Sequence, residues 1–496
     1  MMPENSSSKA LSVEREDSPL EPQSLWAQLR FFAKRWAGSS FFLNLFSVSG
    51  GAVLQRLMGL VAFSYTARVL GPEKYGLLGF GISVAAYAAI FLSPGLLIWG
   101  TREIARQRST AGKILVIVNA AQLLLASVAY GALVIFARFF FSQPSERLIV
   151  ILCGLALFNT ALSVDWVVNG LELMRIPAIL GTCGAGLNLI ALFLLVHSPR
   201  DVYIYALIPA VNGLLLTAVL YFIIIQRLKV HLPWPSWQES RQALLSSLPL
   251  GGMVALTVVL HYANNLIVQA YLGLTALGVF WSAFRLLELA SQVPTLLSTV
   301  FLPRLARVAT SAPDLGRREA LLFARVHMVS GFFLAAFFLG ESPAIIRLIF
   351  GAKYLGAVPL LRIMSIGVIF NYAICGYTNC LISFGKDWVM LRVVGVALIV
   401  SVGGGLLVVP RAGIMGAALV VSAIDLAGWL VSLPYYRQVV GSFQFAAWWR
   451  PALGAGCVVA SCFLLQALGL AVWVRIPLSA LAYFPFVYGE MRRFMA

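Results

Sequence analysis

The stretch Ser64–Gly81, SYTARVLGPEKYGLLGFG, interrupts a long apolar run near the start of the chain. Gly71 and Pro72 follow the apolar residues, a charged pair comes next, and then the apolar run resumes. Glycine at the end of a helix allows the left-handed turn that stops the helix, and proline does not continue one. The stretch therefore predicts a tight hairpin between two helices.

The same pattern recurs about two hundred residues later in the chain. Each copy has a Gly-Gly pair that opens the apolar stretch, a Leu-Gly pair that closes it, and a further glycine at the same interval. These are Gly50–Gly51, Leu70–Gly71 and Gly76 in the first copy, and Gly251–Gly252, Leu272–Gly273 and Gly278 in the second. The copies lie about six apolar segments apart, an even number, so the pattern predicts parallel halves related by a pseudo-two-fold axis along the membrane normal. A chance likeness between two apolar segments is the alternative.

The composition indicates a membrane protein. Of the 496 residues, 60% are hydrophobic and 11% are charged, with a mean hydropathy of +0.89, whereas a soluble domain has about 25% charged residues. Apolar runs of about 20 residues, long enough to cross a bilayer, recur from Phe41 onward. We expect an all-α polytopic membrane protein with about 14 transmembrane helices, arranged as two six-helix bundles plus two C-terminal helices.

The predicted segments follow from these runs and from the basic loops between them. They are a cytoplasmic tail with an interfacial amphipathic helix (1–40), an N-terminal bundle (41–226), a cytoplasmic linker (227–246), a C-terminal bundle (247–436) and two additional helices (437–496). Lysine and arginine gather in alternate loops, which predicts that both termini are cytoplasmic. The net charge of +17 is explained by these loops, and we expect no nucleic-acid partner because no basic folded domain is present.

Charged and amide side chains inside the predicted spans mark a candidate site, because a charge near the bilayer centre normally faces a cavity or a partner. The candidates for substrate binding are Arg56, His261, Asn264, Asn265 and Arg285, and those for ion coupling are Asp165, Glu288 and Asp425. Arg56 is the strongest candidate because no acidic residue lies within a turn of it, and we expect water or another span, such as that of Glu288, to hold its charge in the empty cavity. Basic groups with amides suit a phosphate or a carboxylate.

Each of the other candidates has a structural alternative. Arg285 and Glu288 are three residues apart and could only neutralise each other. His261 could be a packing histidine, Asp165 could be solvated at the end of its span, and Asp425 could bond to a neighbouring helix.

The sequence carries no catalytic constellation. There is no phosphate-binding Gly-x-x-x-x-Gly-Lys-Ser/Thr loop, and the six cysteines and four histidines lack metal-ligand spacing. We therefore expect no enzyme activity, no metal and no cofactor, and transport driven by an ion gradient, the membrane potential or the substrate gradient.

Six short motifs occur in an order that resembles one family. They are ARVLGPEKYG, GTREIAR, WVVNGLELMR, YLGLTALGVFWSAFRL, FGAKYLGAVPLLRIMS and VVPRAGIMGAALV. The chain is similar, from about Phe41 to Tyr436, to the polysaccharide exporter and O-antigen flippase family of the multidrug, oligosaccharidyl-lipid and polysaccharide exporter superfamily.

The resemblance implies a flippase for an undecaprenyl-diphosphate-linked oligosaccharide in the bacterial inner membrane, working by alternating access. It implies membrane lipids and a polysaccharide polymerase as further partners, and it adds Arg102 of GTREIAR at the cytoplasmic mouth as a candidate for receiving the headgroup. A lipid II flippase, a multidrug cation antiporter of the same superfamily and a membrane-embedded glycan polymerase or ligase are the alternatives. The last of these would show a large external loop, and none is present.

Overall fold

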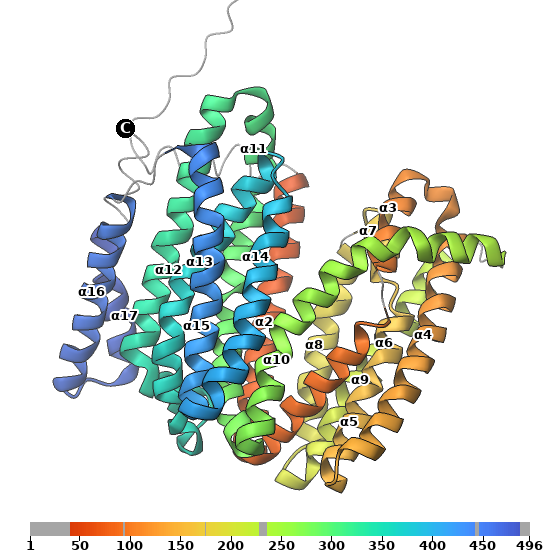
Figure 1. Cartoon of the computed structure of the whole chain (residues 1–496), viewed down its shortest axis with the longest axis horizontal. Helices are drawn as coiled ribbons and strands as arrows, with labels where there is room; N and C mark the ends of the chain where they lie inside the picture. Colours follow the sequence, from red (N-terminus) through yellow and green to blue (C-terminus); the bar gives the residue numbers. More distant parts are fainter. Residues whose placement is uncertain (1–39, 93–94, 174, 228–235, 442–445, 487–496) are drawn as a thin grey trace, which may run out of the picture.

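The computed structural model describes residues 40–92, 95–173, 175–227, 236–441 and 446–486, and every regular element in these ranges is a helix. The interfacial helix expected in residues 1–40 lies outside them. The helices form two lobes, followed by a C-terminal pair (Figure 1).

The first lobe contains α2 (Ser40–Ala89), α3 (Leu96–Arg106), α4 (Ala111–Phe140), α5 (Pro144–Gly154), α6 (Ala156–Leu162), α7 (Asp165–Gly170), α8 (Arg175–Leu195) and α9 (Val202–Arg227). The second lobe contains α10 (Trp237–Ala290), α11 (Gln292–Ser311), α12 (Pro313–Ile349), α13 (Val358–Ser383), α14 (Trp388–Ile399) and α15 (Gly405–Val440). The pair is α16 (Ala446–Ala467) and α17 (Val472–Leu481). Short 3-10 turns η1 (Arg108–Thr110), η2 (Pro199–Asp201) and η3 (Ala352–Ala357) and a π-turn η4 (Val400–Gly404) connect them.

The prediction of fourteen transmembrane helices is confirmed. In the described ranges, nine helical segments are long and apolar enough to cross a membrane. Two of them bend sharply, at Gly273 and Gly413, and each therefore supplies two crossings. The α2 hairpin, bent at Gly71, adds two more, and the short apolar segment Val472–Phe486 completes the set. Because α10 begins at Trp237, part of the expected linker is helical.

The two hairpins cross at their repeated glycines. Gly71 has a φ of 73° and Gly273 a φ of 82°, a region that favours glycine. A Cβ on Gly76 would lie 1.9 Å from the carbonyl oxygen of Leu274, and one on Gly278 would lie 1.8 Å from that of Pro72. Each hairpin thus touches the other at the equivalent place, which is the reciprocal contact that a two-fold relation between the halves requires. Only glycine permits this approach of two backbones.

An aromatic core closes the hairpin end of the molecule. The ring of Tyr75 packs 4.6 Å from that of Trp281 and 6.1 Å from that of Tyr354. Hydrogen bonds across the lobes reinforce this contact: Tyr354 donates to the carbonyl of Ala67 at 2.8 Å, and Arg68 Nε donates to that of Ile349 at 2.9 Å. Arg68 therefore caps the C-terminus of α12 and holds the two lobes together here.

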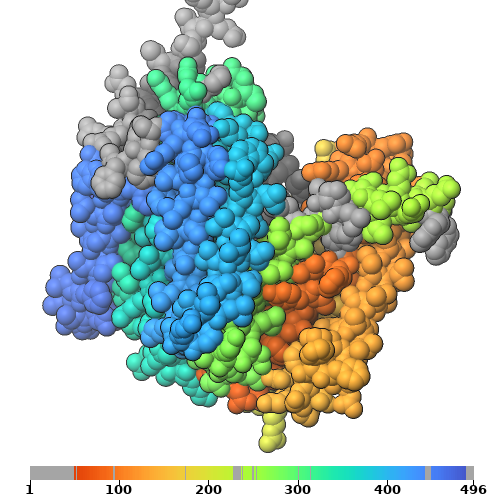
Figure 2. All heavy atoms as spheres, viewed as in Figure 1, coloured from red at the N-terminus to blue at the C-terminus, as the bar shows by residue number. Residues whose placement is uncertain are grey.

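The lobes diverge toward the opposite end, where α3 and the turn between α11 and α12 lie (Figures 1 and 2). This end, called the basic end below, carries Arg102, Arg106, Arg108, Arg304, Arg307, Arg317 and Arg318. The first turns of α10 lie against the first lobe, where Lys113 of α4 forms an ion pair with Glu239. The hydrogen bond from Lys113 lowers the pKa of the Glu239 carboxyl. The helix α10 thus links both lobes.

The last helix is tied to the second lobe by a buried ion pair that the sequence did not predict. Arg475 Nη2 of α17 donates to Glu341 Oε2 of α12 at 3.0 Å, and both side chains are almost fully buried. A buried cation normally has such an anionic partner, because an unpaired one is costly.

Candidate functional site

A cavity of about 730 Å³ lies between the lobes, next to the aromatic core. Its walls come from α2, α8 and α9 of the first lobe and from α10, α11, α13 and α15 of the second. The side chains of His261 and Arg285 are 38% and 31% exposed, so solvent reaches the interior. Six of the nine predicted site residues line it: Arg56, His261, Asn264, Arg285, Glu288 and Asp425.

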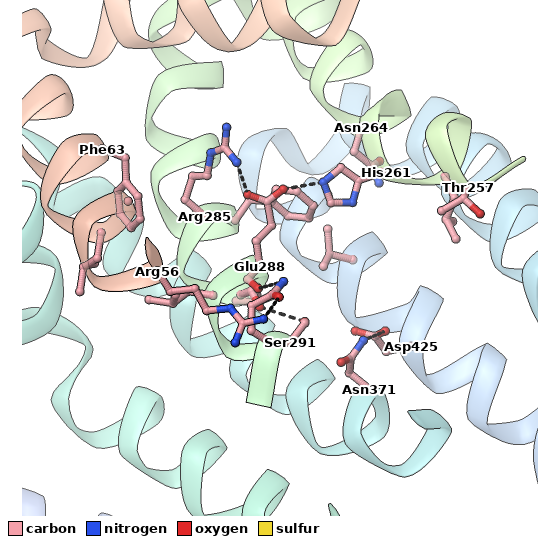
Figure 3. Close-up of a pocket in the computed structure, with 18 of the residues that line it drawn as sticks. Arg56, Phe63, Thr257, His261, Asn264, Arg285, Glu288, Ser291, Asn371 and Asp425 are labelled. Atoms are coloured by element: carbon pink, nitrogen blue, oxygen red, sulfur yellow. Dashed lines mark hydrogen bonds and ion pairs between the residues drawn. The ribbon is translucent and has the colours of Figure 1, made fainter. Parts of the chain in front are cut away.

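Glu288 connects the two arms of the α10 hairpin (Figure 3). Its Oε1 lies 2.5 Å from Nε2 of His261 on the first arm, and its Oε2 accepts a hydrogen bond from Arg285 Nη1 at 2.6 Å on the second. The guanidinium of Arg285 also stacks 4.5 Å from the ring centre of Trp281, within the aromatic core. The acid and the two basic groups thus form one cluster on the wall of the cavity.

Arg56 has no acidic partner within the described part of the chain. Its Nη2 donates to Gln292 Oε1 at 3.2 Å, and its buried Nη1 has no hydrogen-bond partner there. A residue of another span therefore contacts Arg56, but it is Gln292 of α11 and not Glu288, which is engaged by His261 and Arg285. A guanidinium presents several donors in a rigid fork, so Arg56 retains the capacity to bind an anion.

The opposite wall carries an acid, Asp425, which accepts a hydrogen bond from an amide. Asp425 Oδ1 of α15 accepts from Asn371 Nδ2 of α13 at 3.0 Å, and no ion pair is formed by Asp425 in these ranges. The alternative that Asp425 bonds to a neighbouring helix is therefore realised. The sequence analysis missed Asn371, whose signal was a lone amide in an apolar helix.

The charges of the cavity balance, whereas the sequence analysis favoured a basic site. Arg56 and Arg285 oppose Glu288 and Asp425. Hydrogen-bonding capacity is nevertheless left over on both lobes. The buried atoms of the cavity residues that lack a partner among the described residues are Nη1 of Arg56, Oδ1 of Asn188 and Oδ1 of Asn264. A cavity lined by both a guanidinium and amides suits a ligand that carries both a phosphate and hydroxyl groups.

Three predicted site residues lie elsewhere. Arg102 is exposed on α3 at the basic end, and Asp165 is exposed at the start of α7, where it accepts from the hydroxyl of Ser163 at 3.2 Å. The solvated alternative therefore describes Asp165. Asn265 is buried and donates to Ser83 at 2.9 Å, which joins the two hairpins beside the cavity. No cluster of metal-ligating side chains occurs in the part of the chain described.

Two lobes, each with a bent hairpin, thus surround a solvent-accessible polar cavity. The family model for polysaccharide biosynthesis proteins matches residues 42–309, more than half of the chain. The chain therefore belongs to the polysaccharide biosynthesis protein family. A search of curated proteins found no significant relative.

Solved structures show the same fold. The lipid II flippase MurJ in an inward closed conformation has a TM-score of 0.72 at 14% identity, over 90% of this chain and 99% of that one. An inward-facing MATE family multidrug resistance transporter of the MOP superfamily has a TM-score of 0.61 at 15% identity, over 78% and 94%. An outward-facing one has a TM-score of 0.53 at 15% identity, over 80% and 94%.

Proposed function

We propose that this protein is a flippase that moves an undecaprenyl-diphosphate-linked oligosaccharide across the bacterial inner membrane by alternating access. The observation that carries the proposal is Arg56, which lines the cavity without an acidic partner in the described ranges, together with the amides of Asn188 and Asn264 on the cavity walls. A diphosphate supplies the anion for the guanidinium, and sugar hydroxyls supply donors for the amides.

The closed hairpin end and the diverging basic end support an inward-open state of the proposed flippase. Basic residues are enriched on the cytoplasmic side of membrane proteins, so we assign the basic end to the cytoplasm. The cavity is then closed toward the outside by Arg68 and the aromatic core. The higher TM-score with the inward-facing MATE transporter than with the outward-facing one supports the same state. Arg102, exposed at this end, remains a proposed first contact for the headgroup.

Glu288 and Asp425 are the proposed ion-coupling groups. Glu288 contacts both His261 and Arg285. An anion that binds Arg285 in place of Glu288 would leave the carboxylate paired with His261 alone. Such an exchange links substrate binding to a change of charge on the α10 hairpin.

A second candidate function is cation antiport, as carried out by multidrug transporters. The observation that favours it is Asp425, an acid on the cavity wall with an amide partner and no ion pair in the described ranges. A lipophilic cation would bind there and would not need Arg56.

The decisive experiment measures flipping of a fluorescent undecaprenyl-diphosphate-linked oligosaccharide by purified protein in proteoliposomes. We expect Arg56→Ala to lower the rate by about a hundredfold, since a charge-assisted hydrogen bond is worth about 1.5–3 kcal/mol. Arg56→Lys should recover part of the rate, because a point charge remains but the fork does not. Arg138→Ala, an exposed position on α4 outside the cavity, is the matched control.

One result would contradict the role of Arg56, and another would contradict the proposed function itself. Full flipping by Arg56→Ala would show that Arg56 does not bind the diphosphate. Efflux of a cationic dye that depends on Asp425, with no flipping of the lipid-linked oligosaccharide, would establish the second candidate function.

A further inference from the structure

A second cavity lies inside the first lobe. It has a volume of about 280 Å³ and is bounded by the second arm of the α2 hairpin, by α5 and α6, and by α9. None of its lining residues is charged, and the polar ones are Cys153, Thr160 and Tyr205. Nothing in the proposed binding of a saccharide diphosphate uses this space.

Small side chains and two helix irregularities create the cavity. Six alanines line it: Ala85, Ala86, Ala89, Ala156, Ala206 and Ala210. The break between α5 and α6 lies on one wall, and Pro209 of α9 on another. Interiors are otherwise close-packed, with few voids larger than a water molecule. The concave surface therefore follows from the sequence of four helices, α2, α5, α6 and α9.

Tyr205 lines both cavities, so the two cavities lie next to each other at this residue. Pro209 has no N–H to donate to the carbonyl of Tyr205, one turn earlier, so the junction also holds a backbone acceptor without its helical partner. Arg56 lines the cavity on one side of Tyr205, and mainly apolar residues line the cavity on the other.

We propose that the apolar cavity binds the first isoprenoid units of the carrier lipid. The inference rests on the proposed function, in which the diphosphate binds at Arg56. In that substrate the diphosphate is bonded directly to an isoprenoid chain, so a site for one places the other next to it. An apolar cavity of 150 Å³ holds benzene, and this cavity is about twice as large, which is enough for roughly two five-carbon units.

The equivalent positions of the second lobe could not bind an isoprenoid chain in this way. Gly71 and Gly273 are equivalent by their turns, and the same offset pairs Ala85 with Leu287 and Ala86 with Glu288. A large side chain and a charge thus replace the alanines in the second hairpin. The structure therefore assigns the lipid chain to the first lobe.

The test compares two probes, farnesyl diphosphate and inorganic pyrophosphate, by equilibrium binding to the purified full chain. Wild type should bind farnesyl diphosphate at least tenfold more tightly. Ala86→Phe fills the cavity, and it should reduce this preference by about tenfold or more, the effect of excluding two methylene groups. Pyrophosphate affinity should not change. Ala132→Phe is the matched control, because Ala132 is exposed on α4 outside both cavities.

The outcomes separate the inference from the proposed function. Equal farnesyl preference in wild type and Ala86→Phe would overturn the inference and leave the diphosphate site intact. Failure of wild type to bind either probe would overturn both. A third measurement needs no variant: farnesyl diphosphate with a photoreactive diazirine on its second isoprene, counted from the diphosphate, should cross-link to residues 78–89, 153–160 or 205–210. Cross-links confined to other helices would overturn the inference even if Ala86→Phe does not fold.

Discussion

The two hairpins α2 and α10 share one backbone plan and differ in what their side chains offer. Both turn at a glycine with positive φ and cross at a second glycine five residues later. The equivalent positions along their arms are Gly59 and His261, Ser83 and Arg285, and Ala86 and Glu288. Conversely, Arg56 has the apolar Val258 as its equivalent. The repeated backbone builds the crossing, and the unlike side chains build a polar wall in one lobe and an apolar pocket in the other.

This difference suits an amphiphilic substrate better than a symmetric site would. A lipid-linked saccharide has a charged and hydroxylated head and an apolar chain. Two identical lobes would offer the same chemistry to both parts of it. The following experiments test, in order of expected effect, whether the shared crossing and the unlike arms have the roles assigned to them.

The largest effect is expected at the crossing glycines. Gly76→Leu and Gly278→Leu each place a bulky side chain where even a Cβ would lie within 2 Å of a carbonyl oxygen of the other hairpin. We expect neither variant to give folded protein, as judged by size-exclusion chromatography after extraction. Gly131→Leu, at a helical glycine with open space around it, should behave as wild type. Loss of folded protein in only one of the two variants would contradict the reciprocal crossing.

The second effect concerns the buried ion pair between Arg475 and Glu341, which attaches α17 to α12 of the second lobe. Removing one partner of a buried ion pair costs about 3–5 kcal/mol, so Glu341→Ala should markedly lower the stability of the protein to heat. The double variant Glu341→Leu with Arg475→Leu should recover most of it, because no unpaired charge then remains. An unchanged melting temperature in Glu341→Ala would show that the α12–α17 pair does not stabilise the fold.

The glycine pattern was sufficient to predict the hairpins because positive φ and close backbone approach are local requirements that few residues meet. The number of membrane spans could be predicted from hydropathy, because the length of an apolar run is also a local property of the sequence. The partners within the cavity could not be predicted. Arg56 meets Gln292 236 positions away, and Asp425 meets Asn371 across two helices. Such pairs depend on how the lobes close, which no periodicity records. The buried Arg475–Glu341 pair escaped detection because its two residues lie in separate, otherwise apolar spans.

The third effect tests the charge on the α10 hairpin. Glu288→Gln retains hydrogen-bonding groups but removes the anion shared by His261 and Arg285. Pyrophosphate should then bind more tightly, by about tenfold, because a competing carboxylate is gone. Flipping should become slower, because residue 288 then has no carboxylate that could displace the substrate from Arg285. Glu239→Gln, at the start of the same helix and outside the cavity, is the control. Weaker pyrophosphate binding in Glu288→Gln would contradict a competing role.

The smallest effect is expected at the closed hairpin end, where Arg68 of the α2 hairpin binds α12 and the α10 hairpin has no equivalent arginine. Arg68 donates to carbonyls at the C-terminus of α12, where a cation also interacts favourably with the helix dipole. Its equivalent in α10 is Ala270, which has no such group. Arg68→Gln should weaken the closure by about 1 kcal/mol, which shifts the two-state population about fivefold toward an outward-open form.

The population can be read from the accessibility of the cavity. A cysteine at Gly59, which lines the cavity and has open space around it, would be labelled by a membrane-impermeant thiol reagent from the hairpin side. The exposed Cys183 and Cys457 are replaced by serine to lower the background. Labelling should rise in Arg68→Gln but not in Lys74→Gln, because Lys74 pairs with the adjacent Glu73. If both variants label alike, the lobes are held shut by the aromatic core around Tyr75 and Trp281, and the closure belongs to both hairpins equally.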